Sequence, residues 1–196
     1  MRYFYDCEFI EDGTTIDLVS IGVVAEDGRE FYAVSTEFDP SRAGRWVRAN
    51  VLDKLPSPSS QAYRSRSRIR EDLAGYLLQG RDPRRVRPGE IELWAWVGAY
   101  DHVVLCQLWG DMTALPRYMP RFTRELKQRW QECGSPALPP APGDAHDALA
   151  DARHNLAKFR AIDAALAGRA PGRPVADGTV CGRILGPRMR PGPAAA

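Results

Sequence analysis

The chain has 196 residues, of which 44% are hydrophobic and 27% charged, and its formal net charge is +2. This composition fits one globular domain with a hydrophobic core and excludes a disordered or fibrous protein. Residues 169–196 hold five arginines and one aspartate, a net charge of +4, which leaves −2 for the rest of the chain. A body so close to neutral does not indicate nucleic-acid binding by bulk charge, so such a function would depend on local groups.

The cysteines and the hydropathy pattern narrow the class of protein further. The four cysteines are widely spaced and form no Cys-x-x-Cys pair, which argues against a zinc cluster or a disulfide framework. The sequence contains no apolar run of about 18 residues, and charged residues interrupt the start of the chain where a signal peptide would be apolar. We therefore expect a cytoplasmic protein that makes no contact with a membrane.

Alternating hydrophobic residues and turn signals predict three antiparallel strands at the start of the chain. Residues 1–9 form an aromatic-rich first strand, residues 17–25 a second and residues 30–35 a third, joined by short turns that contain glycine. A loop region rich in proline and serine follows over residues 39–60. Within it, residues 46–50 are expected to form a short helix.

The rest of the chain predicts one more long strand among several helices. The recurrence of apolar residues at helical spacing indicates helices, and a run dense in tryptophan and valine indicates a buried strand. Prolines at positions 136–142 mark a loop before the last helix. In chain order we expect a helix over residues 60–78, a strand over 90–100, a helix from about 103, a helix over 121–133 and a final helix over 147–166.

Two acidic residues stand near the end of the first expected strand. Asp6 and Glu8 are separated by one residue, and because successive side chains of a strand point to opposite faces, both carboxylates should share one face. Tyr5, Cys7 and Phe9 should then point to the other face. At a separation of about 5 Å and an effective dielectric constant of about 20, two such charges repel by roughly 3 kcal/mol. A divalent cation would offset this repulsion, although an isolated Asp-x-Glu is too common to indicate a function by itself.

Asp101 and the pair His146 and Asp151 are the next candidate residues of the site. Asp101 follows the fourth expected strand and would open a helix near the carboxyl end of that strand, although helix capping alone would also explain an aspartate there. Asp151 would lie on the last helix and His146 at or before its first turn. Ala148 and Ala150 are small, which would allow this helix to approach the sheet closely.

The pattern Asp6-x-Glu8, Asp101 and His146-x-Ala148-x-x-Asp151 resembles the DEDDh family of 3′-to-5′ exonucleases. In that family the acidic pair lies on the first strand, the second aspartate opens a helix after the fourth strand, and the histidine and last aspartate accompany the final helix. The resemblance implies an α/β fold with a ribonuclease H-like mixed five-stranded sheet and helices on both faces. It covers residues 1–168 as an exonuclease domain, whereas residues 169–196, rich in arginine, proline and glycine, would form a partly disordered tail.

The residue types and the resemblance together imply a metal-dependent hydrolase. Two Mg²⁺ or Mn²⁺ ions would be held by the carboxylates of Asp6, Glu8, Asp101 and Asp151, because hard oxygen ligands suit hard cations. His146 would act as general base and take the proton of the attacking water. The product would be nucleoside 5′-monophosphates, released one at a time from a 3′ end.

The runs Tyr5–Phe9 and Trp96–His102 are similar to those of the small bacterial polyadenylate-specific 3′-exoribonucleases, the ribonuclease AS group. This similarity implies single-stranded RNA with a 3′-adenylate end as the substrate, and related small exonucleases imply a homodimer. Cys7 and Phe9 flank the acids and are candidate substrate-binding residues through their backbone or, for Phe9, through stacking on a base. Many members of the family have threonine and glycine after the acidic pair, whereas Phe9 and Ile10 follow it here.

Two other interpretations remain open. The same residues suit a DEDDh exonuclease that acts on single-stranded DNA in proofreading or repair, since nothing in the sequence reads the 2′-hydroxyl of RNA. A non-catalytic nucleic-acid-binding module could also keep the fold. Loss of at least one site residue would be expected in such a module, and all five are present.

Overall fold

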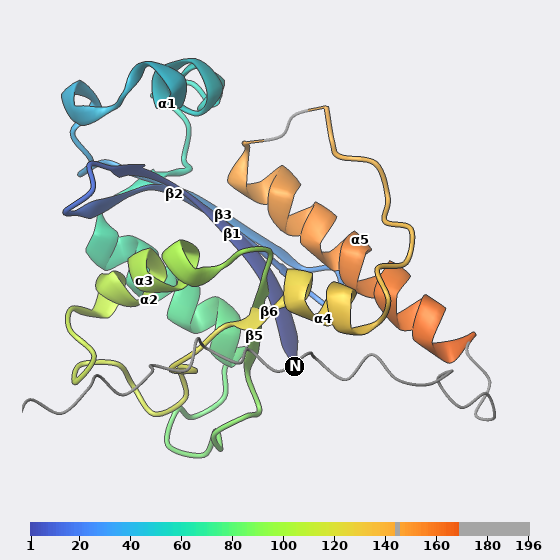
Figure 1. Ribbon diagram of the computed structural model, residues 1–196. Helices are drawn as coiled ribbons and strands as arrows, with labels where there is room; N and C mark the ends of the chain where they lie inside the picture. Colours follow the sequence, from blue (N-terminus) through green and yellow to red (C-terminus); the bar gives the residue numbers. More distant parts are fainter. Residues whose placement is uncertain (144–145, 169–196) are drawn as a thin grey trace, which may run out of the picture.

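The computed structural model describes residues 1–143 and 146–168 and has one mixed β-sheet at its centre (Figure 1). The strand order is β4-β3-β2-β1-β5-β6. β1 pairs antiparallel with β2 and β2 with β3, whereas β1 with β5, β3 with β4 and β5 with β6 are parallel pairs. The strands are β1 (Arg2–Glu11), β2 (Ile16–Ala25), β3 (Glu30–Ser35), β4 (Tyr63–Arg64), β5 (Glu92–Ala95) and β6 (Arg124–Glu125).

Helices cover both faces of this sheet, as the sequence predicted. Helices α2 and α3 pack on one face, and α4 and α5 on the other (Figure 1). Helix α1 and the short 3-10 helices η1 and η2 belong to a separate small lobe that packs on Ile10 and Val19 near the far ends of β1 and β2. The α-helices are α1 (Arg45–Asn50), α2 (Arg66–Leu78), α3 (Ala99–Cys106), α4 (Leu126–Glu132) and α5 (Ala148–Ala167), and the 3-10 helices are η1 (Pro40–Arg42), η2 (Leu52–Lys54) and η3 (Gln107–Trp109).

The alternation of β1 divides the core into two halves. Tyr3, Tyr5 and Cys7 are buried among the apolar side chains of α2 and α3. Phe4 points to the other face, where it packs with Phe159 of α5 at a ring-centroid distance of 5.0 Å. The acidic residues of β1 continue the second series, so the strand carries them to the face that α5 covers.

Helix α5 approaches the sheet closely because only small residues, alanine on the helix and glycine on the sheet, lie where the two meet. Ala148 and Ala150 are buried at the start of the helix, as expected from their size. On the sheet side, Gly22 of β2 is paired with Asp6 of β1. A Cβ atom on Gly22 would lie only 2.2 Å from the carbonyl oxygen of Ala148, so no other residue fits there without a shift of the helix. The first turn of α5 is thereby held directly over the acidic part of β1.

Two expectations about the sheet were wrong in detail. Six strands are present in the described residues rather than five, because the two-residue strands β4 and β6 pair in parallel with β3 and β5. The strand expected over residues 90–100 ends at Ala95, and α3 already begins at Ala99. Gly98 lies in the connecting turn, where an added Cβ would lie 2.4 Å from the Cβ of Ala95.

Two expected helices begin later than predicted, because the short strands β4 and β6 occupy residues near the start of each expected range. The helix expected from residue 60 begins at Arg66, where the Ser65 hydroxyl caps it by accepting a hydrogen bond from the Arg68 amide. The helix expected over residues 121–133 covers Leu126–Glu132. The tail expected over residues 169–196 lies outside the described residues. None of the described helices is both long and apolar enough to cross a membrane.

Substituting alanine for Gly22 tests the close contact between α5 and the sheet. We expect Gly22→Ala to lower the free energy of unfolding by about 1–3 kcal/mol, because the methyl group would overlap backbone atoms of α5. Urea unfolding measures this change. The matched control is Gly75→Ala in α2, where a Cβ meets nothing within 4 Å and the better helix propensity of alanine should stabilise by about 1 kcal/mol. A Gly22→Ala protein as stable as the original would contradict this packing.

Candidate active site

A cleft of about 470 Å³ opens between β1, the lobe that contains α1, the start of α3 and the first three turns of α5. All seven residues that the sequence singled out for the site line this one cleft, although they come from positions up to 145 residues apart. Its walls combine carboxylates with aromatic rings and one lysine. The lining residues are Asp6, Cys7, Glu8, Phe9, Glu11, Trp46, Val47, Val51, Trp96, Asp101, His146, Asp151, Asn155 and Lys158.

Asp101 is fixed against β1 between the two acids of that strand. It lies in the first turn of α3 and is only 7% exposed. Its Oδ1 accepts a hydrogen bond of 2.7 Å from the backbone amide of Cys7. Because Cys7 stands between Asp6 and Glu8, this bond brings the third carboxylate to the place where the first two emerge from the strand.

The turn before α3 places Asp101 and one wall of the cleft together. Val97 has φ +57°, a conformation that β-branched residues rarely adopt. The carboxylate of Glu125 compensates by accepting hydrogen bonds from the amides of Val97 and Gly98, at 2.8 and 2.9 Å. Trp96 on one side of the turn and Asp101 on the other therefore have fixed positions in the cleft.

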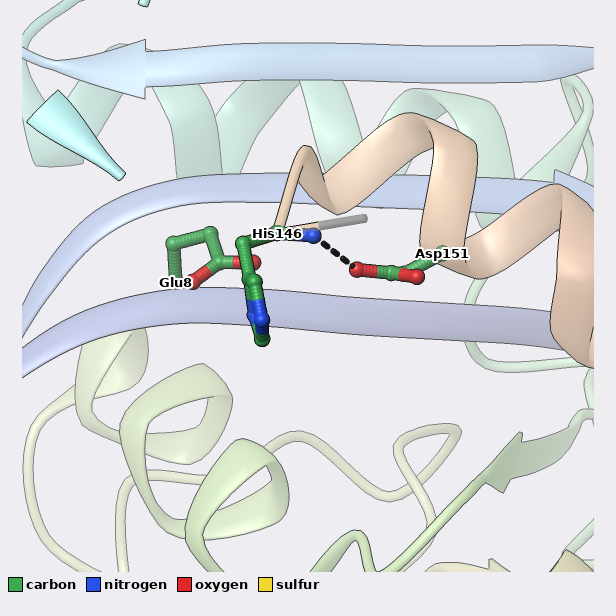
Figure 2. A group of neighbouring side chains, drawn as sticks. All are labelled: Glu8, His146 and Asp151. Atoms are coloured by element: carbon green, nitrogen blue, oxygen red, sulfur yellow. Dashed lines mark hydrogen bonds between the residues drawn. The ribbon is translucent and has the colours of Figure 1, made fainter. Parts of the chain in front are cut away.

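His146 and Asp151 lie close to Glu8 at the N-terminal end of α5. One possible ligand atom from each of these three residues lies within 4.8 Å of the other two (Figure 2). The His146 amide donates a hydrogen bond of 2.7 Å to Oδ2 of Asp151, and His146 has φ +69°. Asp147 caps the helix by accepting from the Ala150 amide at 2.8 Å. The His-x-Ala-x-x-Asp pattern thus forms a tight turn that places His146 beside Glu8 and Asp151.

Burial makes negative charge costly in this cleft. It raises the pKa of Glu8 to about 8, with further contributions from Asp151 and Asp101. Burial also lifts the pKa of Asp6 well above its usual range, and repulsion from three acidic neighbours adds to the shift. The pKa of Asp101 rises to about 6, again through burial, although the hydrogen bond from Cys7 opposes the shift. The four carboxylates cannot all be ionised at neutral pH unless cations join them.

The donor set fits hard divalent cations. Carboxylate oxygens with one imidazole are ligands that Mg²⁺ and Mn²⁺ accept, and the buried acids supply the negative charge that such ions neutralise. Glu8, His146 and Asp151 form the tightest group, while Asp6 and Asp101 line the same cleft beside it. The cleft can therefore hold metal ions, with carboxylates on three sides.

The two expected substrate-binding residues lie at the site in different ways. The thiol of Cys7 is buried on the far face of β1, where its sulfur lies 3.8 Å from the carbonyl oxygen of Asp101. Phe9 is half-buried, and its ring stacks on Tyr100 at a centroid distance of 5.9 Å. Tyr100 itself is 59% exposed. Phe9 therefore belongs to a partly exposed aromatic pair, whereas Cys7 offers the cleft its backbone alone.

Sequence reasoning missed the other seven residues that line the cleft, and four of these bring an aromatic ring, an amide or a positive charge to it. Trp46 of α1 lies edge-on to His146, with ring centroids 4.8 Å apart, and Trp96 forms part of another wall. Asn155 and Lys158 follow Asp151 on the same face of α5, at helical spacings of four and seven residues. That spacing was a signal that could have found the last two, because the helix face on which a predicted site residue lies continues along the helix.

A family model described as the 3′-5′ exoribonuclease Rv2179c-like domain matches residues 1–163. The chain belongs to this family. Among curated proteins, the 3′-5′ exoribonucleases Rv2179c and MT2234.1, from the H37Rv and CDC 1551 strains of Mycobacterium tuberculosis, are each 67% identical over 163 residues. The match covers 83% of this chain and 93% of each relative. The expected 3′-to-5′ exonuclease family is thereby confirmed.

This chain is similar in fold to a solved structure of Escherichia coli exonuclease I in complex with single-stranded DNA, in its zinc-bound form. The TM-score is 0.54 at 11% sequence identity, and the match covers 83% of this chain but 40% of that one. At this identity the likeness concerns the fold alone. It confirms the expected ribonuclease H-like architecture, with the correction of the strand number given above.

The raised pKa of Glu8 predicts an unusual effect of pH on the metal-free protein. Between pH 4.5 and about 8 the carboxyl of Glu8 ionises in the unfolded chain but keeps its proton in the folded one. The folded state then binds more protons than the unfolded state, so its stability falls as the pH rises through this window. Urea unfolding in the presence of a chelator should show the loss.

The Glu8→Gln variant removes this ionisation and serves as the matched comparison. In chelator at pH 8 we expect it to be more stable than the original protein by at least about 1 kcal/mol, since one unit of pKa shift corresponds to about 1.4 kcal/mol. At pH 4.5 the difference should shrink, because Glu8 is protonated in the folded protein there. A variant that is less stable at pH 8 would show that burial of Glu8 carries no such cost.

Proposed function

We propose that this protein hydrolyses single-stranded RNA from its 3′ end and releases nucleoside 5′-monophosphates. The observation that carries this proposal is the convergence of four carboxylates and one imidazole in a single cleft, in a chain that is 67% identical to two 3′-5′ exoribonucleases over 93% of their length. The five residues are Asp6, Glu8, Asp101, His146 and Asp151.

The carboxylates would hold two Mg²⁺ or Mn²⁺ ions, as their chemistry and burial favour. Bound there, the ions would supply Lewis-acid stabilisation of the negative charge that develops on the phosphodiester during hydrolysis. The protein holds the ligands before any ion arrives: the Cys7 amide fixes Asp101, and the His146 amide fixes Asp151. Such preorganisation lowers the cost of assembling a site for a charged transition state.

His146 is the general base of the proposed reaction. Its ring lies among acidic groups at the mouth of the cleft, and imidazole exchanges protons readily near neutral pH. Trp46 packs edge-on to the ring and restricts its orientation. The imidazole takes the proton of the attacking water.

The finer features of the substrate and assembly are also part of the proposal. A preference for 3′-adenylate rests on the likeness of the Tyr5–Phe9 and Trp96–His102 runs to polyadenylate-specific enzymes, and the Phe9–Tyr100 pair offers a surface on which a purine can stack. We propose a homodimer by analogy with small exonucleases. Cysteines without disulfides among the described residues, together with an RNA substrate, favour the cytoplasm.

One incubation series tests the proposed function. Purified protein is mixed with 3′-adenylated RNA, with matched RNA lacking the tail, and with single-stranded DNA, each with Mg²⁺, Mn²⁺ or chelator. We expect metal-dependent shortening with release of adenosine monophosphate, fastest for the tailed RNA. Preferential shortening of DNA would favour the alternative of a DEDDh exonuclease that acts on single-stranded DNA, and no shortening of any substrate would favour a binding module.

Two variants separate the proposed base from the proposed metal ligands. We expect His146→Ala to lower kcat by about 10²–10⁴-fold, the usual contribution of a general base, while Mn²⁺ binding persists. Asp151→Asn should abolish both activity and Mn²⁺ binding, since it removes a ligand charge. Single-turnover rates and Mn²⁺ titration provide the two measurements. Loss of Mn²⁺ binding in His146→Ala would instead make the histidine a ligand.

A further inference from the structure

Lys158 is a basic residue that lines the acidic cleft, and the proposed chemistry has not used it. It lies on α5 seven residues after Asp151, which places both side chains on the face that looks into the cleft. Burial lowers the pKa of Lys158, while the charges of Asp151 and Asp6 oppose that shift. The ammonium group therefore stands close enough to two carboxylates of the site to sense their charges.

The position of the ammonium group is fixed by its surroundings. Lys158 Nζ donates a hydrogen bond of 3.1 Å to Oδ1 of Asn155. Asn155 is fully buried, and its Nδ2 donates at 3.1 Å to the carbonyl oxygen of Tyr5 on β1. The ammonium also lies 4.5 Å from the centre of the Trp96 ring, a distance typical of a cation–π contact. These contacts tie a flexible side chain to the strand that carries the acids.

The charge balance of the cleft indicates what this cation is for. An ammonium has three donors, and the bond to Asn155 accounts for one of them. Once divalent cations occupy the carboxylates, Asp6 and Asp151 no longer offer Lys158 a free negative partner. The anion that enters a loaded site is the phosphate of the substrate, and lysine is a common ligand of phosphate.

We propose that Lys158 is a catalytic residue that contacts the phosphate at which the 3′-terminal nucleotide is cut. This phosphate leaves as the 5′-phosphate of the released monophosphate, so the same contact exists with the product. The inference rests on the proposed exonuclease function. It assigns to the chain a phosphate contact made by the protein itself, in addition to those that metal ions supply.

The test compares the binding of adenosine monophosphate with that of adenosine in the presence of Mn²⁺. The two ligands differ only in the phosphate, so their ratio of affinities isolates contacts to it. We expect Lys158→Met to weaken monophosphate binding about tenfold or more, the effect of losing one charged hydrogen bond, and to leave adenosine binding unchanged. The kcat/KM for RNA should fall by at least the same factor. Lys158→Gln, a polar replacement without charge, should behave like Lys158→Met.

The matched control is Lys127→Met, because Lys127 is exposed on α4 and its replacement makes the same change in net charge. We expect it to bind both ligands as the original protein does. Mn²⁺ titration and urea unfolding of each variant check that the metal site and the fold persist. If the Lys158 variants keep the original preference for monophosphate, or if they lose both ligands equally, the proposed phosphate contact is wrong.

A third possible result would give Lys158 a different role. If Lys158→Met binds Mn²⁺ more tightly and keeps the original affinity for monophosphate, the lysine acts only as a counter-charge for the empty site. That result overturns the inference but leaves the proposed function intact. The function is tested separately by whether the original protein shortens RNA.

Discussion

The burial of acidic side chains on β1 is the constraint on which the rest of the structure depends. The strand must pack Tyr3, Tyr5 and Cys7 into the core while its other face holds two carboxylates that burial keeps from ionising freely. Neighbouring elements respond in a specific way: they add two more carboxylates, an imidazole and a lysine at the same point instead of covering the acids with apolar groups. The fold thus holds acidic groups close together although this destabilises the metal-free protein. Such an arrangement is expected when a bound cation supplies the compensating positive charge.

Close approach of backbone to backbone makes this arrangement possible. Gly22 and the small residues at the start of α5 allow the helix to lie directly on β2 beside Asp6, so His146 and Asp151 reach the acids without long, mobile side chains. Across the cleft, the turn held by Glu125 sets Asp101 in a similar way. The position of each of these side chains thus depends on a contact of the main chain elsewhere in the fold. Stability and function are linked at these points, because a substitution that loosens the contact also spreads the carboxylates apart.

The site could be predicted from the sequence to a greater extent than the fold around it. Asp6 and Glu8 on one strand face, and His146 with Asp151 at a helix start, follow from local periodicity, and the structure brings all four to one cleft. Gly22 and Trp46 could not be placed in this way, because their roles arise from contacts with residues more than 50 positions away in the chain. The short strands β4 and β6 were missed for the same reason: two residues form a strand only because a partner strand lies beside them. Tertiary contact, which a single sequence does not display, decided these cases.

The most direct test of this account is a calorimetric titration of the metal-free protein with Mn²⁺ near pH 7.5, in which the number of ions bound per chain is counted. Four carboxylates gathered around one cleft predict two ions per chain, with protons released as the acids with raised pKa values ionise. Asp6→Asn, which removes the acid surrounded by the three others, should abolish binding of at least one ion. If the original protein binds no Mn²⁺ and releases no protons, the cluster is not a metal site and the proposed reaction loses its basis.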